Sequence, residues 1–222
     1  MPTQRPDRFV PPVENWSAVV LAAGLGQRMG GMAKPLIRVN GELLLSRLIQ
    51  SAHQAGAHEV ICAVSAATMQ TYLKSERAPS ANLRWEPVPT GGTAAHSLRR
   101  ALTAVHPRSA CVMVCLADQA LIDAHAMQAL LHAYANRPAT CDMVQPWVND
   151  APGNPVVITA ELGRQWLAFP DASVGQAWRE QHPHRVHRWH TNDTRYRQDI
   201  DTLEDVEALR AAGHRVDLPK TS

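Results

Sequence analysis

The chain of 222 residues has little that would suit a membrane or a polyanionic partner. It lacks an apolar run near the roughly 20 residues that cross a bilayer, and its N-terminus lacks the charged-then-apolar order of a secretory signal. Its 22 basic and 20 acidic side chains leave a formal net charge of +2, and neither sign forms a long block. This leaves a small anionic ligand open but gives a nucleic acid or a membrane surface little electrostatic support. We therefore expect a soluble, cytoplasmic protein with neither of those partners.

The chain also lacks the cysteine and histidine spacings that are typical of metal sites. None of its four cysteines forms a C-x-x-C pair, and three lie in apolar runs where a thiol behaves as a small hydrophobic group. The segment QHPHRVHRWH holds four histidines, but along a strand His184 and His190 would share one face and His187 the other. We expect no functional metal at this histidine cluster, residues 182–190. The cysteines, which we interpret as reduced structural thiols, are Cys62, Cys111, Cys115 and Cys141.

The order of apolar patterns predicts a single α/β domain. Residues 1–15 contain four prolines and little apolar content, which is typical of a disordered arm, so we place the domain at residues 16–217. Short apolar runs then alternate with segments of helical spacing, which indicates three layers, a mostly parallel sheet between helices. The expected strands cover 17–23, 59–65, 83–88 and 109–118, and the expected helices 43–57, 67–77, 93–106 and 124–137.

This alternation loosens in the C-terminal part of the chain. CDMVQPWV and GNPVVI read as strands with no helix between them, which predicts a hairpin or an antiparallel excursion. Helices follow near 160–168 and 173–181, then a strand over 184–191. In the last helix, 202–213, Thr202 and Asp205 have the spacing of an N-cap and its acidic partner.

The stretch VVLAAGLGQRMGGMAKPL, residues 19–36, places a glycine-rich turn between the first strand and the first helix. Free N–H groups in such a turn attract phosphate oxygens. The spacing Gly24-x-Gly26-x-x-x-Gly30 differs from a dinucleotide loop, and Lys34 is followed by proline instead of the Ser or Thr of a Walker loop. A nucleoside triphosphate loop is the third interpretation, and glycines that only let strand and helix pack closely are the fourth.

Arg28 and Lys34 favour the triphosphate interpretation. Arginine grips two oxygens with a rigid fork, whereas lysine is a point charge on a flexible stem. Two unlike cations six residues apart suit a polyphosphate that is to be cleaved. Asp118 ends an expected central strand, at the sheet edge where open α/β proteins bind ligands, and a carboxylate there suits Mg²⁺.

Four segments resemble the MobA-like nucleotidyltransferases, and the branch that makes the cytidine form of the molybdenum cofactor is the most similar. They are LAAGLGQRMGGMAKPL, CLADQALI, GNPVVI and DIDTLEDVEAL, in the order of that family. The resemblance implies a Rossmann-like, GT-A-like nucleotidyltransferase fold. It also implies that Arg28, Lys34 and Asp118 are catalytic, and that Asp118 and Asp201 hold Mg²⁺ or Mn²⁺. Asp199, on the same face of the strand expected at 197–201 as Asp201, is the alternative second ligand.

The resemblance also divides the remaining site residues between two substrates. His96 departs from the small residue that the family has, and Asn154 replaces its histidine. With Asp199 they are our candidates for contacts to the acceptor. One of the tryptophans Trp147, Trp166, Trp178 and Trp189 could stack on a pterin ring. The residues implied to bind the nucleotide are Leu21, Ala22, Ala23, Gly24, Gly26, Arg28, Lys34, Thr90, Gly91 and Ser97.

The implied reaction transfers a nucleoside monophosphate to a phosphorylated acceptor and releases pyrophosphate. In the family an A-A-G start goes with cytosine, so Ala23 favours CTP over GTP, and molybdopterin is the implied acceptor. A sugar 1-phosphate or another phosphorylated metabolite is an alternative acceptor. A non-catalytic carrier of the molybdenum cofactor, which serves a molybdoenzyme or its chaperone, is an alternative of another class.

Overall fold

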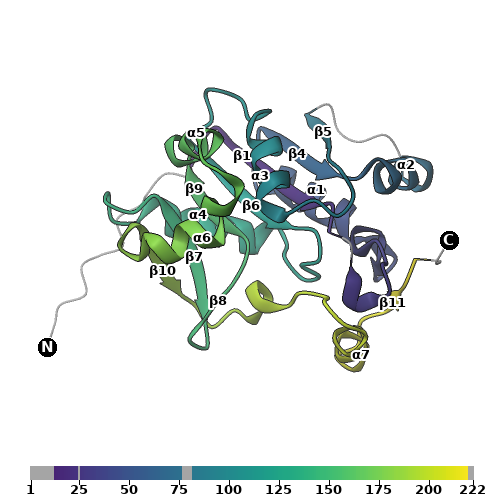
Figure 1. The fold of residues 1–222 in the computed structure, drawn as a ribbon. Coiled ribbons are helices and arrows are strands. Elements are labelled where there is room, and N and C mark those ends of the chain that lie inside the picture. The colour runs from purple at the N-terminus through teal and green to yellow at the C-terminus, as the bar shows by residue number, and fades with distance from the viewer. Residues whose placement is uncertain (1–12, 25, 77–81, 220–222) are drawn as a thin grey trace, which may run out of the picture.

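The computed structural model describes residues 13–24, 26–76 and 82–219. Eight strands form the main sheet, and three short strands form a second one (Figure 1). The strands of the main sheet are β1 (Trp16–Ala22), β4 (Glu59–Val64), β5 (Leu83–Pro87), β6 (Cys111–Leu116), β7 (Met143–Val148), β8 (Ala151–Pro152), β9 (Val156–Thr159) and β10 (Val186–His190). The second sheet consists of β2 (Arg38–Val39), β3 (Glu42–Leu43) and β11 (Val216–Asp217).

Seven α-helices and five 3₁₀ turns connect the described strands. The helices are α1 (Leu44–Gln54), α2 (Ala66–Ser75), α3 (Ala94–Leu102), α4 (Ala124–Ala135), α5 (Ala160–Ala168), α6 (Gln176–Gln181) and α7 (Leu203–Ala211). The 3₁₀ turns are η1 (Gln27–Met29), η2 (Lys34–Leu36), η3 (Asp171–Ser173), η4 (Pro183–Arg185) and η5 (Thr194–Arg197). None of the helices in these ranges has the length and apolar character that a membrane span requires.

The main sheet runs in the order β10-β7-β9-β6-β1-β4-β5, with β8 paired to β7. All pairs from β6 to β5 are parallel, whereas β9 is antiparallel to both of its neighbours and β8 is antiparallel to β7. The expected mostly parallel sheet with an antiparallel excursion is therefore confirmed. Because parallel strands end at one edge, the loops after β1, β5 and β6 meet there.

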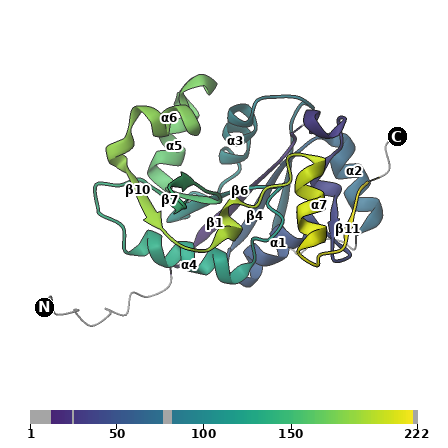
Figure 2. The ribbon, with the colours of Figure 1, turned by 90° about the horizontal axis from the view of Figure 1, so that it is seen from below.

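Helices cover both faces of this sheet, as Figure 2 shows. The core on one face packs α1 and α4 against the sheet, with Leu48 and Met127 fully buried. The core on the other face packs α3, α5 and α6, and there the rings of Trp166 and Trp178 meet edge to face at 5.9 Å. Burial of each such large apolar side chain stabilises the fold by about 1.5–3 kcal/mol. The single-domain, three-layer α/β architecture follows from these two cores.

A third, smaller core lies at the end of the molecule that holds α7 and the second sheet (Figure 2). It joins Met29 and Ile37, which flank Lys34 in the chain, to Val206 and Leu209 of α7. The glycine-rich loop and the segment before α7 lie far apart in sequence. This core holds them side by side, and that places their charged side chains together.

The structure differs from the expected elements in four respects. Residues 197–201 form no strand: only an isolated antiparallel bridge joins Asp199 to Gln119. His184 lies in η4, because Pro183 starts a 3₁₀ turn, so it does not share a strand face with His190. The helix expected at 173–181 begins at Gln176, since Gly175 has a positive φ of 63° and interrupts the helix. Strands β2, β3, β8 and β11 were not expected, because two residues are too short to show an alternating pattern.

Candidate active site

The glycine-rich loop follows β1 and folds back on itself through η1. The N–H groups of Met29 and Gly31 both donate to the Gly26 carbonyl, at 2.8 and 3.1 Å. Gly26 has a left-handed φ of 53°, and a Cβ at this position would lie 2.2 Å from the carbonyl oxygen of Met32. Only glycine fits such a position. A Cβ added at Gly24, by contrast, would have no heavy atom within 4 Å, because this position faces open space.

Lys34 begins η2 and extends its ammonium group between two carboxylates. Its Nζ donates to Oδ2 of Asp118 at 3.2 Å and to Oδ1 of Asp201. The side chain of Lys34 is only 14% exposed, so water screens the contact with Asp118 weakly. Burial alone would lower the pKa of Lys34, but the hydrogen bonds and charges of Asp201 and Asp118 outweigh it and raise that pKa. Lys34 is therefore a fixed positive charge at neutral pH.

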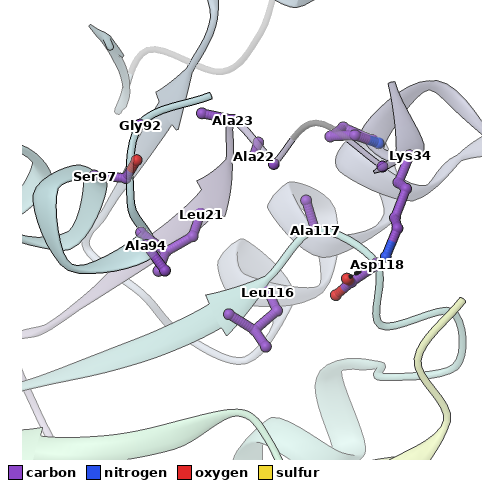
Figure 3. Close-up of a pocket in the computed structure, with 13 residues that line it drawn as sticks. Leu21, Ala22, Ala23, Lys34, Gly92, Ala94, Ser97, Leu116, Ala117 and Asp118 are labelled. Atoms are coloured by element: carbon purple, nitrogen blue, oxygen red, sulfur yellow. Dashed lines mark hydrogen bonds and ion pairs between the residues drawn. The ribbon is translucent and has the colours of Figure 1, made fainter. Parts of the chain in front are cut away.

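Asp118 lies two residues beyond the end of β6, at the sheet edge where the sequence places it. Figure 3 shows its carboxylate meeting Lys34 across the mouth of the cavity beneath the glycine-rich loop. Burial raises the pKa of Asp118, and the Lys34 charge opposes that effect. Its second oxygen, Oδ1, is buried and has no hydrogen-bond donor among the described residues. The carboxylate thus has a free ligand position.

The segment before α7 supplies two further carboxylates. Its backbone joins that of the Asp118 loop, because Ile200 N–H donates to the Asp118 carbonyl at 2.9 Å. Asp205 accepts from the N–H groups of Asp201 and Thr202 at 2.8 and 2.7 Å and so fixes the turn. The expected capping pair of Thr202 and Asp205 is confirmed as a complete capping box. This turn directs the Asp201 side chain to Lys34.

Asp199 is the most perturbed carboxyl group of the cluster. Burial, and then the negative charges of Asp118 and Asp201, raise its pKa to about 7. Its Oδ1 is buried without a hydrogen-bond partner in the described chain, as is Oδ1 of Asp118. Two carboxylates thus contact the ammonium group of Lys34, and the carboxyl group of Asp199 interacts with it through charge alone. Arg28, whose side chain is 74% exposed, adds a second cation 3.5 Å from Asp201.

Two adjoining cavities lie over this cluster. The first, of about 250 Å³, runs from Leu21 and Ala22 at the end of β1 to Ser97 of α3 and Asp118 (Figure 3). The second, of about 340 Å³, is lined by the backbone of the glycine-rich loop and by Arg28, Lys34 and Asp201. Lys34 lines both. We name the first, less polar cavity the nucleoside chamber. We name the second the phosphate chamber, because its two cationic side chains and glycine-rich loop suit phosphate groups.

Most of the residues expected to bind the nucleotide line these two cavities. Ala23, Gly24 and Gly26 line the first together with Leu21, Ala22 and Ser97, and Gly91 lines the second. Thr90 is exposed and lines neither of them. Gly92, expected in the turn before the helix that holds Ser97, lines both cavities. Sequence reasoning missed Pro35, Ala94, Leu116 and Ala117, which also line the first cavity. Their only signal was their position beside predicted site residues.

The three candidates for acceptor contacts lie in different surroundings. His96 Nδ1 is 3.6 Å from Asp171 Oδ2, and neither cavity includes it. Asn154 lines a separate cavity of about 360 Å³ on the other side of Leu116. Asp199 belongs to the carboxylate cluster. Gln119, which sequence reasoning passed over, is fully buried and donates from Nε2 to the Asn154 carbonyl, so it joins the Asp118 loop to the Asn154 loop.

The donor atoms of the cluster fit a hard divalent cation. In the described residues, no three His, Cys, Asp or Glu side chains form a preassembled metal site. Magnesium, however, commonly binds through one or two carboxylates and completes its shell with water and substrate phosphates. The unpartnered Oδ1 atoms of Asp118 and Asp199 supply oxygen ligands of that kind. The set therefore suits Mg²⁺ or Mn²⁺ bound together with a triphosphate.

Comparison with known proteins agrees with this geometry. The family model for the MobA-like NTP transferase domain matches residues 18–186. A search of curated proteins gave no match.

Three solved structures share the fold at low sequence identity. The manganese complex of Rv0371c from Mycobacterium tuberculosis H37Rv has 21% identity and a TM-score of 0.66 over 88% of this chain and 97% of that one. A nucleotidyl transferase from Methanothermobacter thermautotroptrophicus has 19% identity and a TM-score of 0.68 over 89% and 96%. The 4-diphosphocytidyl-2C-methyl-D-erythritol synthase of Anaerococcus prevotii has 16% identity and a TM-score of 0.65 over 90% and 98%.

Proposed function

We propose that this chain, which belongs to the MobA-like NTP transferase family, transfers CMP from CTP to the terminal phosphate of molybdopterin and releases pyrophosphate. The observation that carries the proposal is the position of Lys34. This residue lines both the nucleoside chamber and the phosphate chamber, and its ammonium group contacts the carboxylates of Asp118 and Asp201. The α-phosphate of a bound nucleotide would lie at this junction.

The residues of the cluster have distinct roles in such a transfer. An oxygen of the acceptor phosphate attacks the α-phosphorus, and the bond from that phosphorus to the bridging oxygen of pyrophosphate breaks. Little covalent work falls to the protein, so positioning and charge neutralisation dominate. Lys34 neutralises charge near the α-phosphate, while Arg28 and the N–H groups of the glycine-rich loop hold the β- and γ-phosphates.

The proposed role of the carboxylates is to hold the metal. Asp118, with Asp201 as the proposed second ligand, would hold Mg²⁺ or Mn²⁺ against the triphosphate. The unpartnered Oδ1 of Asp199 makes this residue a competitor for the second position. A divalent cation bound there would supply Lewis-acid polarisation of the phosphoryl oxygens. Lys34, which contacts Asp118 and Asp201 in this structure, would then be free to contact phosphate.

Two observations support CTP as the nucleotide. Ala23 occupies the loop position at which an alanine accompanies cytosine in the resembled branch, and it lines the nucleoside chamber. One neighbour in fold is named as a diphosphocytidyl-erythritol synthase.

The test is pyrophosphate release from each of the four NTPs with Mg²⁺ and a panel of phosphorylated acceptors, which includes molybdopterin and glucose 1-phosphate. We expect release with CTP and molybdopterin, and at least tenfold less with GTP. Release of pyrophosphate with glucose 1-phosphate instead of molybdopterin would show that the proposed acceptor is wrong and that the proposed type of reaction is right. Tight cofactor binding without release of pyrophosphate from any pair would favour a carrier and overturn the proposal.

A further inference from the structure

The cavity that includes Asn154 extends the active site away from the phosphate chamber. It has a volume of about 360 Å³, within the usual range for a small-molecule site. At one end it shares Leu21, Ala94 and Leu116 with the nucleoside chamber. At the other end it shares Gln176 and Arg179 with a further cavity of about 300 Å³. The cavity at Asp118 and the cavity at Arg179 therefore adjoin each other through shared lining residues.

The lining of this cavity is mostly apolar. Ten of its fourteen lining residues have apolar side chains, among them Trp166, Val156 and Val174. Its polar side chains are Asn154, Gln176 and Arg179. A sugar carries a hydroxyl group on nearly every carbon. Most of these groups would lose water on burial in this cavity without gaining a hydrogen-bond partner, because only three polar side chains line it. A flat ring system with polar atoms at its edge matches such a lining better.

Arg179 is a cation at the far end, and Glu180 acts on it as a nearby charge but not as a direct ion-pair partner in the described chain. Within the ranges that the structure describes, no hydrogen bond or ion pair involves its guanidinium group. The adjacent carboxylate, Glu180, accepts instead from Nε2 of Gln176 at 2.8 Å. Burial lowers the pKa of Arg179, and the negative charge of Glu180 offsets that effect only in part. The guanidinium fork is therefore available to two adjacent acceptor atoms of a ligand.

The neighbouring cavity adds a second cation to the same end. Arg188 lines it and lies over the ring of Trp147, with its guanidinium carbon 4.5 Å from the ring centroid. This contact fixes the guanidinium group without neutralising its charge. Glu180 also lines this cavity, so its charged side chains, two arginines and one glutamate, leave a net charge of +1 that favours electron-rich ligand atoms.

We propose that the cavity holds the planar heteroaromatic part of the acceptor, and that Arg179 selects this acceptor by donating to two adjacent oxygen or nitrogen atoms at the edge of the ring. The inference rests on the proposed function, because it takes the acceptor phosphate to lie at Asp118. The proposal makes Arg179 a specificity residue for pterin-like acceptors. It predicts that sugar phosphates do not bind in this cavity.

The test uses a probe that needs no catalysis. Isothermal titration calorimetry measures the Kd of 6-hydroxymethylpterin, which is planar and uncharged, for the full chain and for Arg179→Met. Methionine keeps the length of the apolar stem and removes the fork. Arg164→Met is the matched control, since Arg164 is exposed on α5 and pairs with Glu161 outside this cavity. We expect the Kd to rise at least tenfold in Arg179→Met, with no change in Arg164→Met or in the Kd of CTP.

The possible results separate this inference from the proposed function. Equal binding by Arg179→Met, no binding of the pterin to the unaltered chain, or Arg179-dependent binding of glucose 1-phosphate would each overturn the inference. If pyrophosphate is released with molybdopterin and its KM is the same in Arg179→Met, the function stands and the inference fails. If pterin binding depends on Arg179 but no acceptor yields pyrophosphate, the inference stands and the function fails.

Discussion

Replacement of Lys34 by alanine removes the ammonium group that contacts both Asp118 and Asp201. At the observed 3.2 Å, and with an effective dielectric constant of about 20, the attraction between Lys34 and Asp118 is about 5 kcal/mol before desolvation. Loss of one preorganised electrostatic contact to a developing charge costs about 2.7–4 kcal/mol in a catalytic barrier. We therefore expect kcat to fall by about 10²–10³.

Nucleotide binding should survive this change better than turnover. The backbone of the glycine-rich loop and Arg28 remain in place in Lys34→Ala, and both line the phosphate chamber. We expect the Kd of CTP to rise by less than tenfold. The fold should lose about 1–3 kcal/mol, because the partly buried carboxylate of Asp118 loses its donor.

Three measurements check this prediction: pyrophosphate release for kcat, calorimetric titration for the Kd of CTP, and thermal unfolding for the fold. Lys74→Ala is the matched control, since Lys74 is an exposed lysine of α2 away from the site. A kcat within threefold of that of the unaltered chain, with the fold intact, would remove Lys34 from the mechanism. A loss of CTP binding as large as the loss of kcat would instead make Lys34 a binding residue.

Three further predictions concern the metal, the pH dependence and the loop. EDTA should abolish pyrophosphate release and Mg²⁺ or Mn²⁺ should restore it; full activity in EDTA would contradict the proposed role of Asp118. The pKa of Asp199 is about 7 in the folded chain and about 4 in the unfolded chain, so only the folded chain holds this proton between these pH values. The free energy of unfolding therefore decreases as the pH rises from about 4 to 7. In EDTA, the Tm of the unaltered chain should therefore fall relative to that of Asp199→Asn over this window, and parallel curves would refute the shift. Gly26→Ala should lower the Tm and raise the KM for CTP, because its Cβ would lie 2.2 Å from a carbonyl oxygen, whereas Gly24→Ala should keep the Tm.

The main elements of the fold could be predicted because each has a pattern long enough to read. The buried strands β1, β4 and β6 are apolar runs, and α1 has its buried residues at helical spacing. The two-residue strands of the second sheet have no such pattern, so their pairing depends on tertiary contacts. The missed sheet matters for function, since its core brings the glycine-rich loop to α7.

The candidate site could be predicted only as separate motifs. Resemblance pointed to Lys34, Asp118 and Asp201, but their meeting at one ammonium group follows from the fold and not from spacing. Arg179 had no signal in the sequence, because an arginine on a short helix is usually solvated. Its significance comes from the cavity that it lines and from the pairing of Glu180 with another residue.

The balance of charge explains why carboxylates line a site for a triphosphate. Lys34 and Arg28 carry two positive charges, Asp118 and Asp201 carry two negative ones, and Asp199 is half ionised near pH 7. The cluster as a whole therefore offers a triphosphate no net positive charge, although Arg28 and Lys34 line the phosphate chamber and the loop N–H groups also favour phosphate there. The carboxylate oxygens are good ligands for a divalent cation, which the phosphates also bind. Nucleotide and cation must then strengthen the binding of each other by the same factor, since such coupling is reciprocal. Lys34 contacts Asp118 and Asp201 in this structure; under the proposed function it would exchange them for phosphate once nucleotide and cation are bound, so its charge would reach the phosphate only in the complete complex.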